Sequence, residues 1–250
     1  MFEPPPEFKV AHIGLFWDRI RGEFPKVTEQ APLDLPREVE QEPRRSLEPT
    51  LRFETATAPP VRVWFVSKSG NELLQLQQDR FARNWRRGDV SGRYPSYENI
   101  RGPFERDLRT FEKFMSDEKL GALKPVQAEV TYVNHIRPGV WTTHSELDKV
   151  LVNWTAAQGQ FLDAPEDARL AWRYVIRDGK KFAGRLHVAA QPAYAVDDPI
   201  FLLTLTARGN PLGPGIEGAL KFLDLGHEWI VRGFADLTRP AMQQVWKREQ

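Results

Sequence analysis

The stretch WFVSKSGNELLQLQQDRFARNWR, residues 64–86, decides the fold. Residues favoured in strands occur in three short runs, which are separated by a glycine-containing turn at residues 69–71 and a two-residue turn at residues 78–79. The pattern predicts an antiparallel meander. Its three strands are expected at Trp64–Val66, Glu72–Gln77 and Arg80–Arg86.

The second of these runs alternates apolar and polar residues. Because successive side chains of a strand point to opposite faces, Leu74 and Leu76 are predicted on one face and Gln75 and Gln77 on the other. A face of glutamines flanked by arginine and tryptophan indicates a binding surface. The candidate binding residues are Gln75, Gln77, Arg80, Arg83, Asn84, Trp85, Arg86 and Arg93.

The composition of the 250 residues excludes several classes of site. The chain has no cysteine, which excludes disulfides, thiolate nucleophiles and cysteine metal sites. Its formal net charge of +1 gives no overall attraction to nucleic acid or anionic membrane, so any nucleic-acid site must be local. No apolar run is long enough to span a bilayer. We expect a cytoplasmic protein without a membrane role.

The periodicity predicts two units, the first covering residues 1–137. Apolar residues recur every three or four positions over residues 10–24, which predicts an amphipathic helix. The segment 26–60 is rich in proline among charged residues and is predicted to be an extended connector, within which the alternation at 51–55 would allow an edge strand. The meander follows this connector.

Two more elements are expected in the first unit. Pro103 suits the first position of a helix, where its missing N–H costs nothing, and the helix is predicted to run to Lys119. The segment Val126–Ile136 alternates again and is predicted to be a strand.

The second unit, residues 138–250, is expected to repeat the order of helix, antiparallel strands and helix. Thr143 and Glu146 form a capping box that predicts a short helix. A second meander is expected around the turn at residues 177–180, and unbroken helical spacing over residues 216–237 predicts a long final helix. The predicted class is α+β, with two similar antiparallel meanders packed with helices and an internal duplication of architecture.

Four segments together resemble an uncharacterised family of bacterial proteins of about this length. They are residues 64–86, VTYVNHI at 130–136, LTARG at 205–209 and LDLGHEWIVRGFADLT at 223–238. The family has no assigned activity, cofactor or catalytic residue. Its members are scattered sporadically among bacteria, which implies an accessory or defence-type role. They lead into the first helix with a strand, so we expect that strand to be shortened here or the true start to lie elsewhere.

The arginine-rich end of the first meander allows a nucleic-acid interpretation. Arginines between Arg80 and Arg93 could hold phosphates while an aromatic ring stacks an unpaired base. The alternative is that these arginines pair with nearby carboxylates and cover the sheet. We favour the latter.

A third interpretation involves the final helix. Asp224, His227 and Glu228 lie close enough in sequence to offer a carboxylate–imidazole group for a metal-assisted hydrolase. The spacing of a third metal ligand is missing, and His227 stands in an apolar stripe, so a neutral, hydrogen-bonded core histidine is the better interpretation. We predict neither a metal nor a cofactor.

These observations favour a non-catalytic binding component. Its partner is expected to be another protein or a second copy of the chain, with nucleic acid as the alternative partner and metal-assisted hydrolysis third.

Overall fold

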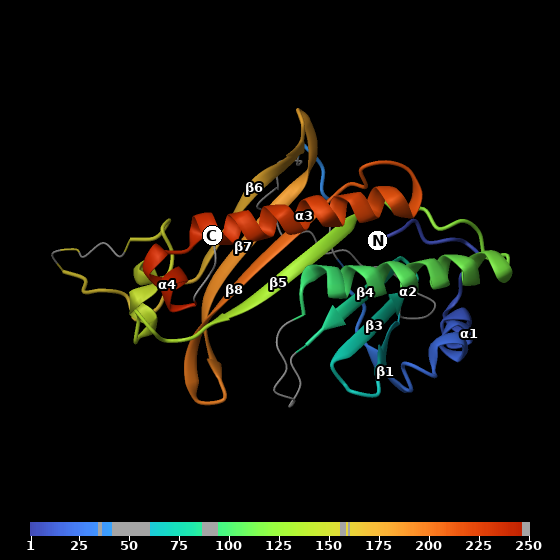
Figure 1. Cartoon of the computed structure of the whole chain (residues 1–250), viewed down its shortest axis with the longest axis horizontal. Coiled ribbons are helices and arrows are strands. Elements are labelled where there is room, and N and C mark those ends of the chain that lie inside the picture. Colours follow the sequence, from blue (N-terminus) through green and yellow to red (C-terminus); the bar gives the residue numbers. More distant parts are fainter. Residues whose placement is uncertain (35–36, 42–60, 87–94, 156–158, 160, 247–250) are drawn as a thin grey trace. The chain divides into compact units, whose positions relative to one another are not determined.

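The computed structural model describes residues 1–34, 37–41, 61–86, 95–155, 159 and 161–246. The chain is an α+β protein with antiparallel sheets, as predicted (Figure 1). The described residues form two sheets of four strands each. It divides into two compact units, each of which includes a short piece from elsewhere in the sequence. The first comprises Met1–Arg37, Gln41–Gln127 and Gly213–Leu220, and the second Glu38–Glu40, Ala128–Leu212 and Lys221–Gln250.

The sheet of the first unit contains the predicted meander and one strand that we did not predict. Its strands follow the sequence in space, as β1 Lys26–Gln30, β2 Arg62–Val66, β3 Glu72–Gln77 and β4 Arg80–Trp85. The prediction of a continuous connector over 26–60 was wrong at β1, which pairs antiparallel with β2. Prolines are tolerated beside an edge strand, and Pro25 and Pro32 flank this one. The proposed strand at 51–55 lies outside the described residues.

Two helices, α1 Val10–Ile20 and α2 Tyr97–Asp117, bury one face of this sheet with an aromatic core. The ring of Phe16 lies 6.3 Å from that of Phe65, 6.3 Å from that of Phe81 and 5.2 Å from that of Phe111. Edge-to-face contacts of this kind add to the stabilisation that burial already provides. The apolar face is therefore the one that carries Phe65, Leu74, Leu76 and Phe81.

Pro103 does not begin α2, contrary to our prediction. The helix starts six residues earlier at Tyr97, after Ser96 as N-cap, and Pro103 lies inside it. A proline inside a helix removes one backbone hydrogen bond. Burial of Leu108, Phe111 and Met115 along the helix offsets that loss.

The second sheet has a different strand order. Its strands β5 Ala128–Ile136, β6 Leu170–Asp178, β7 Lys181–Ala195 and β8 Asp198–Gly209 are arranged β5-β8-β7-β6. We placed β5 with the first unit, but it pairs along its length with β8. Alternation identifies a strand without identifying its partner, because the partner can lie far away in sequence. The duplication is not confirmed, since the first sheet follows sequence order.

A short helix lies between β5 and β6 in the sequence, and another follows the long helix. The capping box predicted at Thr143 and Glu146 is present, and the helix that it opens is the 3-10 helix η1, His144–Lys149. After the long helix, α4 covers Pro240–Val245 and begins with its proline at the first position.

The long helix α3, Gly215–Leu237, covers the apolar face of the second sheet (Figure 1). Two glycines allow a close approach within the second unit. A Cβ atom on Gly226 would lie 2.9 Å from Ala207 and 2.9 Å from Val130, and one on Gly233 would lie 2.9 Å from Leu186. The opposite face of this sheet carries both polar and apolar side chains.

Alanine at two helical glycines is expected to have opposite effects on stability. Gly14 in α1 has nothing within 4 Å of an added Cβ, so Gly14→Ala should raise the free energy of unfolding by about 0.5–1 kcal/mol through helix propensity. Gly226→Ala should lower it by about 1 kcal/mol through overpacking. Urea unfolding of both variants measures this, and a stabilising Gly226→Ala would contradict the close packing of α3.

Candidate functional site

The face of the first sheet opposite the helices carries most of the predicted binding residues. We call it the polar face and define it by six side chains. They are Arg62 and Trp64 on β2, Gln75 and Gln77 on β3, and Arg80 and Asn84 on β4. Leu74 and Leu76 are buried on the other face, which confirms the predicted alternation.

Gln75 is the centre of a side-chain network on the polar face. Its Oε1 accepts hydrogen bonds from Arg62 Nη1 at 3.0 Å and from Trp64 Nε1 at 2.9 Å. Its Nε2 donates to Asn84 Oδ1 at 2.6 Å. Because one amide satisfies three neighbours across three strands, the geometry of this face is fixed before any ligand binds.

Gln77 has a structural role. Only 7% of the residue is exposed, and its Oε1 accepts the backbone N–H of Leu33 at 3.0 Å. Its Nε2 donates to the carbonyl of Leu33 at 3.2 Å and to Asp79 Oδ1 at 3.0 Å. Gln77 therefore holds the segment after β1 against the sheet.

Arg80 is buried, and some of its guanidinium N–H groups are not hydrogen-bonded to any described residue. The residue is 6% exposed, and within the described part of the chain neither its Nε nor its Nη1 has a hydrogen-bond partner. Among the described residues, the closest carboxylate is that of Asp79, which lies 3.9 Å from Arg80 Nη2. Leaving buried donors unsatisfied costs about 1–3 kcal/mol each, so such groups are rare and call for an explanation.

Arg62 places a second guanidinium near that of Arg80. Its Nε is also buried without a hydrogen-bond partner among the described residues. Burial lowers the pKa of Arg62, and the positive charge of Arg80 lowers it further. Two neighbouring positive charges make this part of the polar face favourable for an anion. Arg62 itself is half-buried and leaves access from solvent.

The remaining predicted residues do not join this face. Arg83 belongs to the helix-facing side, where its side chain is 4% exposed and pairs with Glu72 at 2.8 Å and with Asp107. Burial raises the pKa of Asp107, although the charges of Arg83 and Arg106 oppose that shift. Arg83 is thus committed to internal ion pairs.

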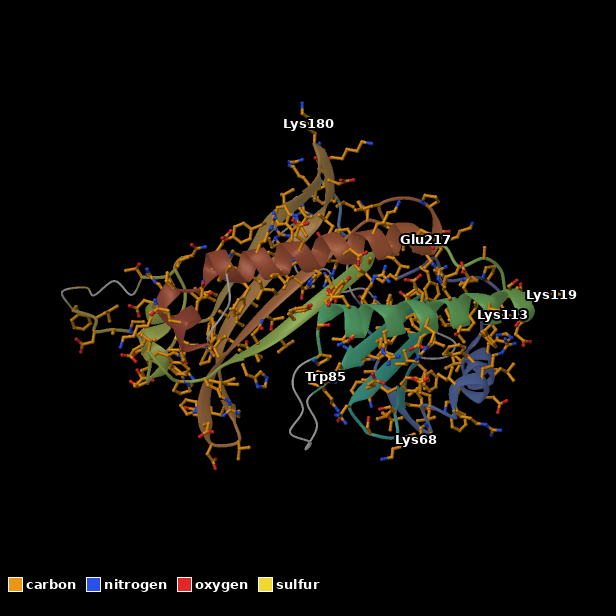
Figure 2. The ribbon with its side chains drawn as sticks, viewed as in Figure 1. Lys68, Trp85, Lys113, Lys119, Lys180 and Glu217 are labelled. Atoms are coloured by element: carbon orange, nitrogen blue, oxygen red, sulfur yellow. The ribbon has the colours of Figure 1, made fainter. Side chains whose placement is uncertain are left out.

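Trp85 lies at the end of β4 (Figure 2). Because it is two residues after Arg83, its side chain lies on the same side of the strand. Arg86 is exposed, and its Nε donates to the carbonyl of Gly70 at 3.1 Å. Arg93 lies outside the described residues. Of the arginines that we grouped as one surface, those that the structure describes are divided between two faces, because side chains alternate along β4.

The residues of the third interpretation lie on α3. His227 is half-buried, and its Nδ1 lies 2.9 Å from the hydroxyl of Tyr132, so it is hydrogen-bonded as predicted. Asp224 and Glu228 are exposed, and Glu228 pairs with Arg232 at 3.0 Å. Across the described ranges, no three His, Asp or Glu side chains are grouped so that they could hold a metal ion.

Sequence analysis missed Arg62. The alternation of Arg62 and Trp64 with the buried Val63 and Phe65 was a usable signal, since it places the first pair on the glutamine side of the meander. Nothing in the sequence showed that Arg80 would be buried with unsatisfied donors.

Searches of protein-family models, curated proteins and solved structures found no match to this chain. None of the helices in the described part of the chain is both long and apolar enough to cross a membrane.

Proposed function

We propose that this protein is a non-catalytic binding component that receives an acidic group of a partner protein on its polar face. The observation that carries the proposal is the buried, incompletely hydrogen-bonded guanidinium of Arg80 beside the charge of Arg62. A carboxylate accepts several hydrogen bonds from arginine, and such charge-assisted bonds are among the strongest in proteins.

Several features favour a carboxylate of a protein over nucleic acid. Single-strand binding typically uses a basic groove together with exposed aromatic rings. Here Arg83 is engaged in internal ion pairs, and the indole N–H of Trp64 is bonded to Gln75. The polar face offers two guanidiniums inside an amide network, which suits a compact anion. Nucleic acid is the second candidate, because Arg86 and Trp85 lie at the end of the same meander.

The proposed setting is the cytoplasm, and it rests on the cysteine-free sequence. An accessory or defence-type role rests on the resemblance of the four sequence segments alone.

Arg62→Gln is expected to weaken binding of an acidic peptide. A labelled hexaglutamate titrated into the full chain should lose about 10- to 100-fold in affinity, the value of one charge-assisted hydrogen bond. The matched control is Arg86→Gln, which removes an exposed arginine of the same meander and should leave the affinity unchanged.

Single-stranded oligothymidine serves as the competing probe. If it binds more tightly than hexaglutamate, with a salt slope near the value of about −3.5 expected for five phosphate contacts, the nucleic-acid alternative replaces the proposal. Equal losses for Arg62→Gln and Arg86→Gln would also count against the polar face.

A further inference from the structure

A second polar cluster lies on the second sheet, on the face opposite α3. Arg185 and His187 are two residues apart on β7, and Arg208 faces Arg185 from β8. All three side chains meet the carboxylate of Glu38. Arg185 Nη1 lies 2.9 Å from Glu38 Oε2, His187 Nε2 lies 2.5 Å from Oε1, and Arg208 Nη1 lies 3.8 Å from Oε1.

The guanidinium of Arg185 also binds the backbone that follows Glu38. Arg185 Nη1 donates to the carbonyl of Val39 at 2.8 Å, and its Nη2 donates to the carbonyl of Glu40 at 3.1 Å. Glu38 is 5% exposed, whereas Val39 and Glu40 are exposed and belong to no helix or strand. Contacts to the main chain together with a pocket for one side chain are one way in which folded domains bind short extended peptides.

The charges of the cluster favour an anion at the position of Glu38. Arg208 Nε also pairs with Glu129 at 2.5 Å. Arginines directly opposite each other on neighbouring strands repel. Burial alone would raise the pKa of Glu38, but hydrogen bonds from His187 and Arg185 outweigh it and hold this pKa below its ordinary value. Glu38 therefore fills the cluster as a carboxylate.

We propose that Arg185, His187 and Arg208 form a binding site for a glutamate-bearing extended peptide, which residues 38–40 of the same chain occupy in cis. A glutamate-bearing segment of a partner protein takes the site when it displaces Glu38. A tethered ligand acts at an effective concentration of the order of millimolar, so the chain's own segment masks the site from weak competitors. This site is independent of the polar face of the first sheet.

The test removes the Glu38 side chain from the site and adds the segment back as a separate peptide. The full chain carrying Glu38→Ala is titrated with the capped peptide REVEQ, which has the sequence of residues 37–41, and binding is followed by NMR. The variant should bind at least about tenfold more tightly than the unaltered chain, in which Glu38 competes. Glu40→Ala is the matched control and should behave like the unaltered chain, because it keeps Glu38.

Two further measurements fix the chemistry. The peptide RQVEQ, which lacks the anchoring carboxylate, should bind Glu38→Ala at least about tenfold more weakly. Adding Arg185→Gln to Glu38→Ala should abolish saturable binding. Equal affinity for the two peptides, or no saturable binding, would overturn the proposal.

The proposal can still be tested if Glu38→Ala does not fold. Glu38→Gln keeps the side-chain volume and is tested in parallel. If neither variant folds alone, millimolar REVEQ should restore the folded spectrum and RQVEQ should not. Failure of REVEQ to do so would overturn the proposal in the same way.

Discussion

Arg83→Ala is expected to lower the free energy of unfolding by about 3–5 kcal/mol. Removing one partner of a buried ion pair leaves the other charge without compensation. The side chain of Asp107 is 8% exposed, so its carboxylate would lose its buried partner where water has little access. The remaining partner, Arg106, bonds to Asp107 but is itself largely exposed.

Denaturant unfolding measures this effect, with Arg86→Ala as control. Arg86 is exposed and its side chain donates to the backbone carbonyl of Gly70, so its replacement should change stability by less than about 0.5 kcal/mol. The double variant Arg83→Ala with Asp107→Asn should recover part of the loss, because the buried charge is gone. A stable Arg83→Ala variant would show that Arg83 is free to serve a ligand.

Arg80→Met is expected to act in the opposite direction and to raise the free energy of unfolding by about 1–4 kcal/mol. A buried charge with unsatisfied donors costs stability, and an apolar side chain of similar length removes that cost. Proteins tolerate such a cost where function requires the group. The same variant should therefore lose affinity for an acidic partner while it gains stability.

The comparison with Arg86→Met separates this effect from a general gain on adding an apolar side chain. Arg86 is exposed, and its replacement should leave both stability and binding nearly unchanged. A destabilised Arg80→Met would mean that Arg80 is a structural residue whose interactions outweigh its burial, and the proposed site would lose its main support.

Local patterns predicted the parts of the fold that depend on local physics. The meander followed from alternation together with a turn in which Gly70 has φ +77°, a conformation that suits glycine. The helix α3 followed from its unbroken spacing of apolar residues. The structure of both segments is determined by residues that lie only a few positions apart in the chain.

The parts that depend on distant partners were not predictable in this way. The sequence of β5 indicates a strand, but its pairing with β8 joins residues such as Tyr132 and Leu205 that are far apart in the chain. Glu38 lies in a proline-rich segment and meets Arg185 147 positions later. No periodicity links such residues, so only the folded structure brings them together.

The candidate site shows the same division. Alternation placed Gln75 and Gln77 on one face, but the grouping of Arg83 with Arg80 ignored that alternation and was wrong. The proposed binding role depends on the unsatisfied donors of Arg80, which result from packing.

The most direct test of the proposed function is a titration of the full chain with hexaglutamate, observed at the NMR signals of the arginine Nε–H groups. We predict saturable shifts of the Arg80 and Arg62 signals and none at Arg86, with the Arg62 shift lost in Arg80→Met. Unchanged Arg80 and Arg62 signals at saturating peptide, in a folded protein, would contradict the proposal that this face binds an acidic partner.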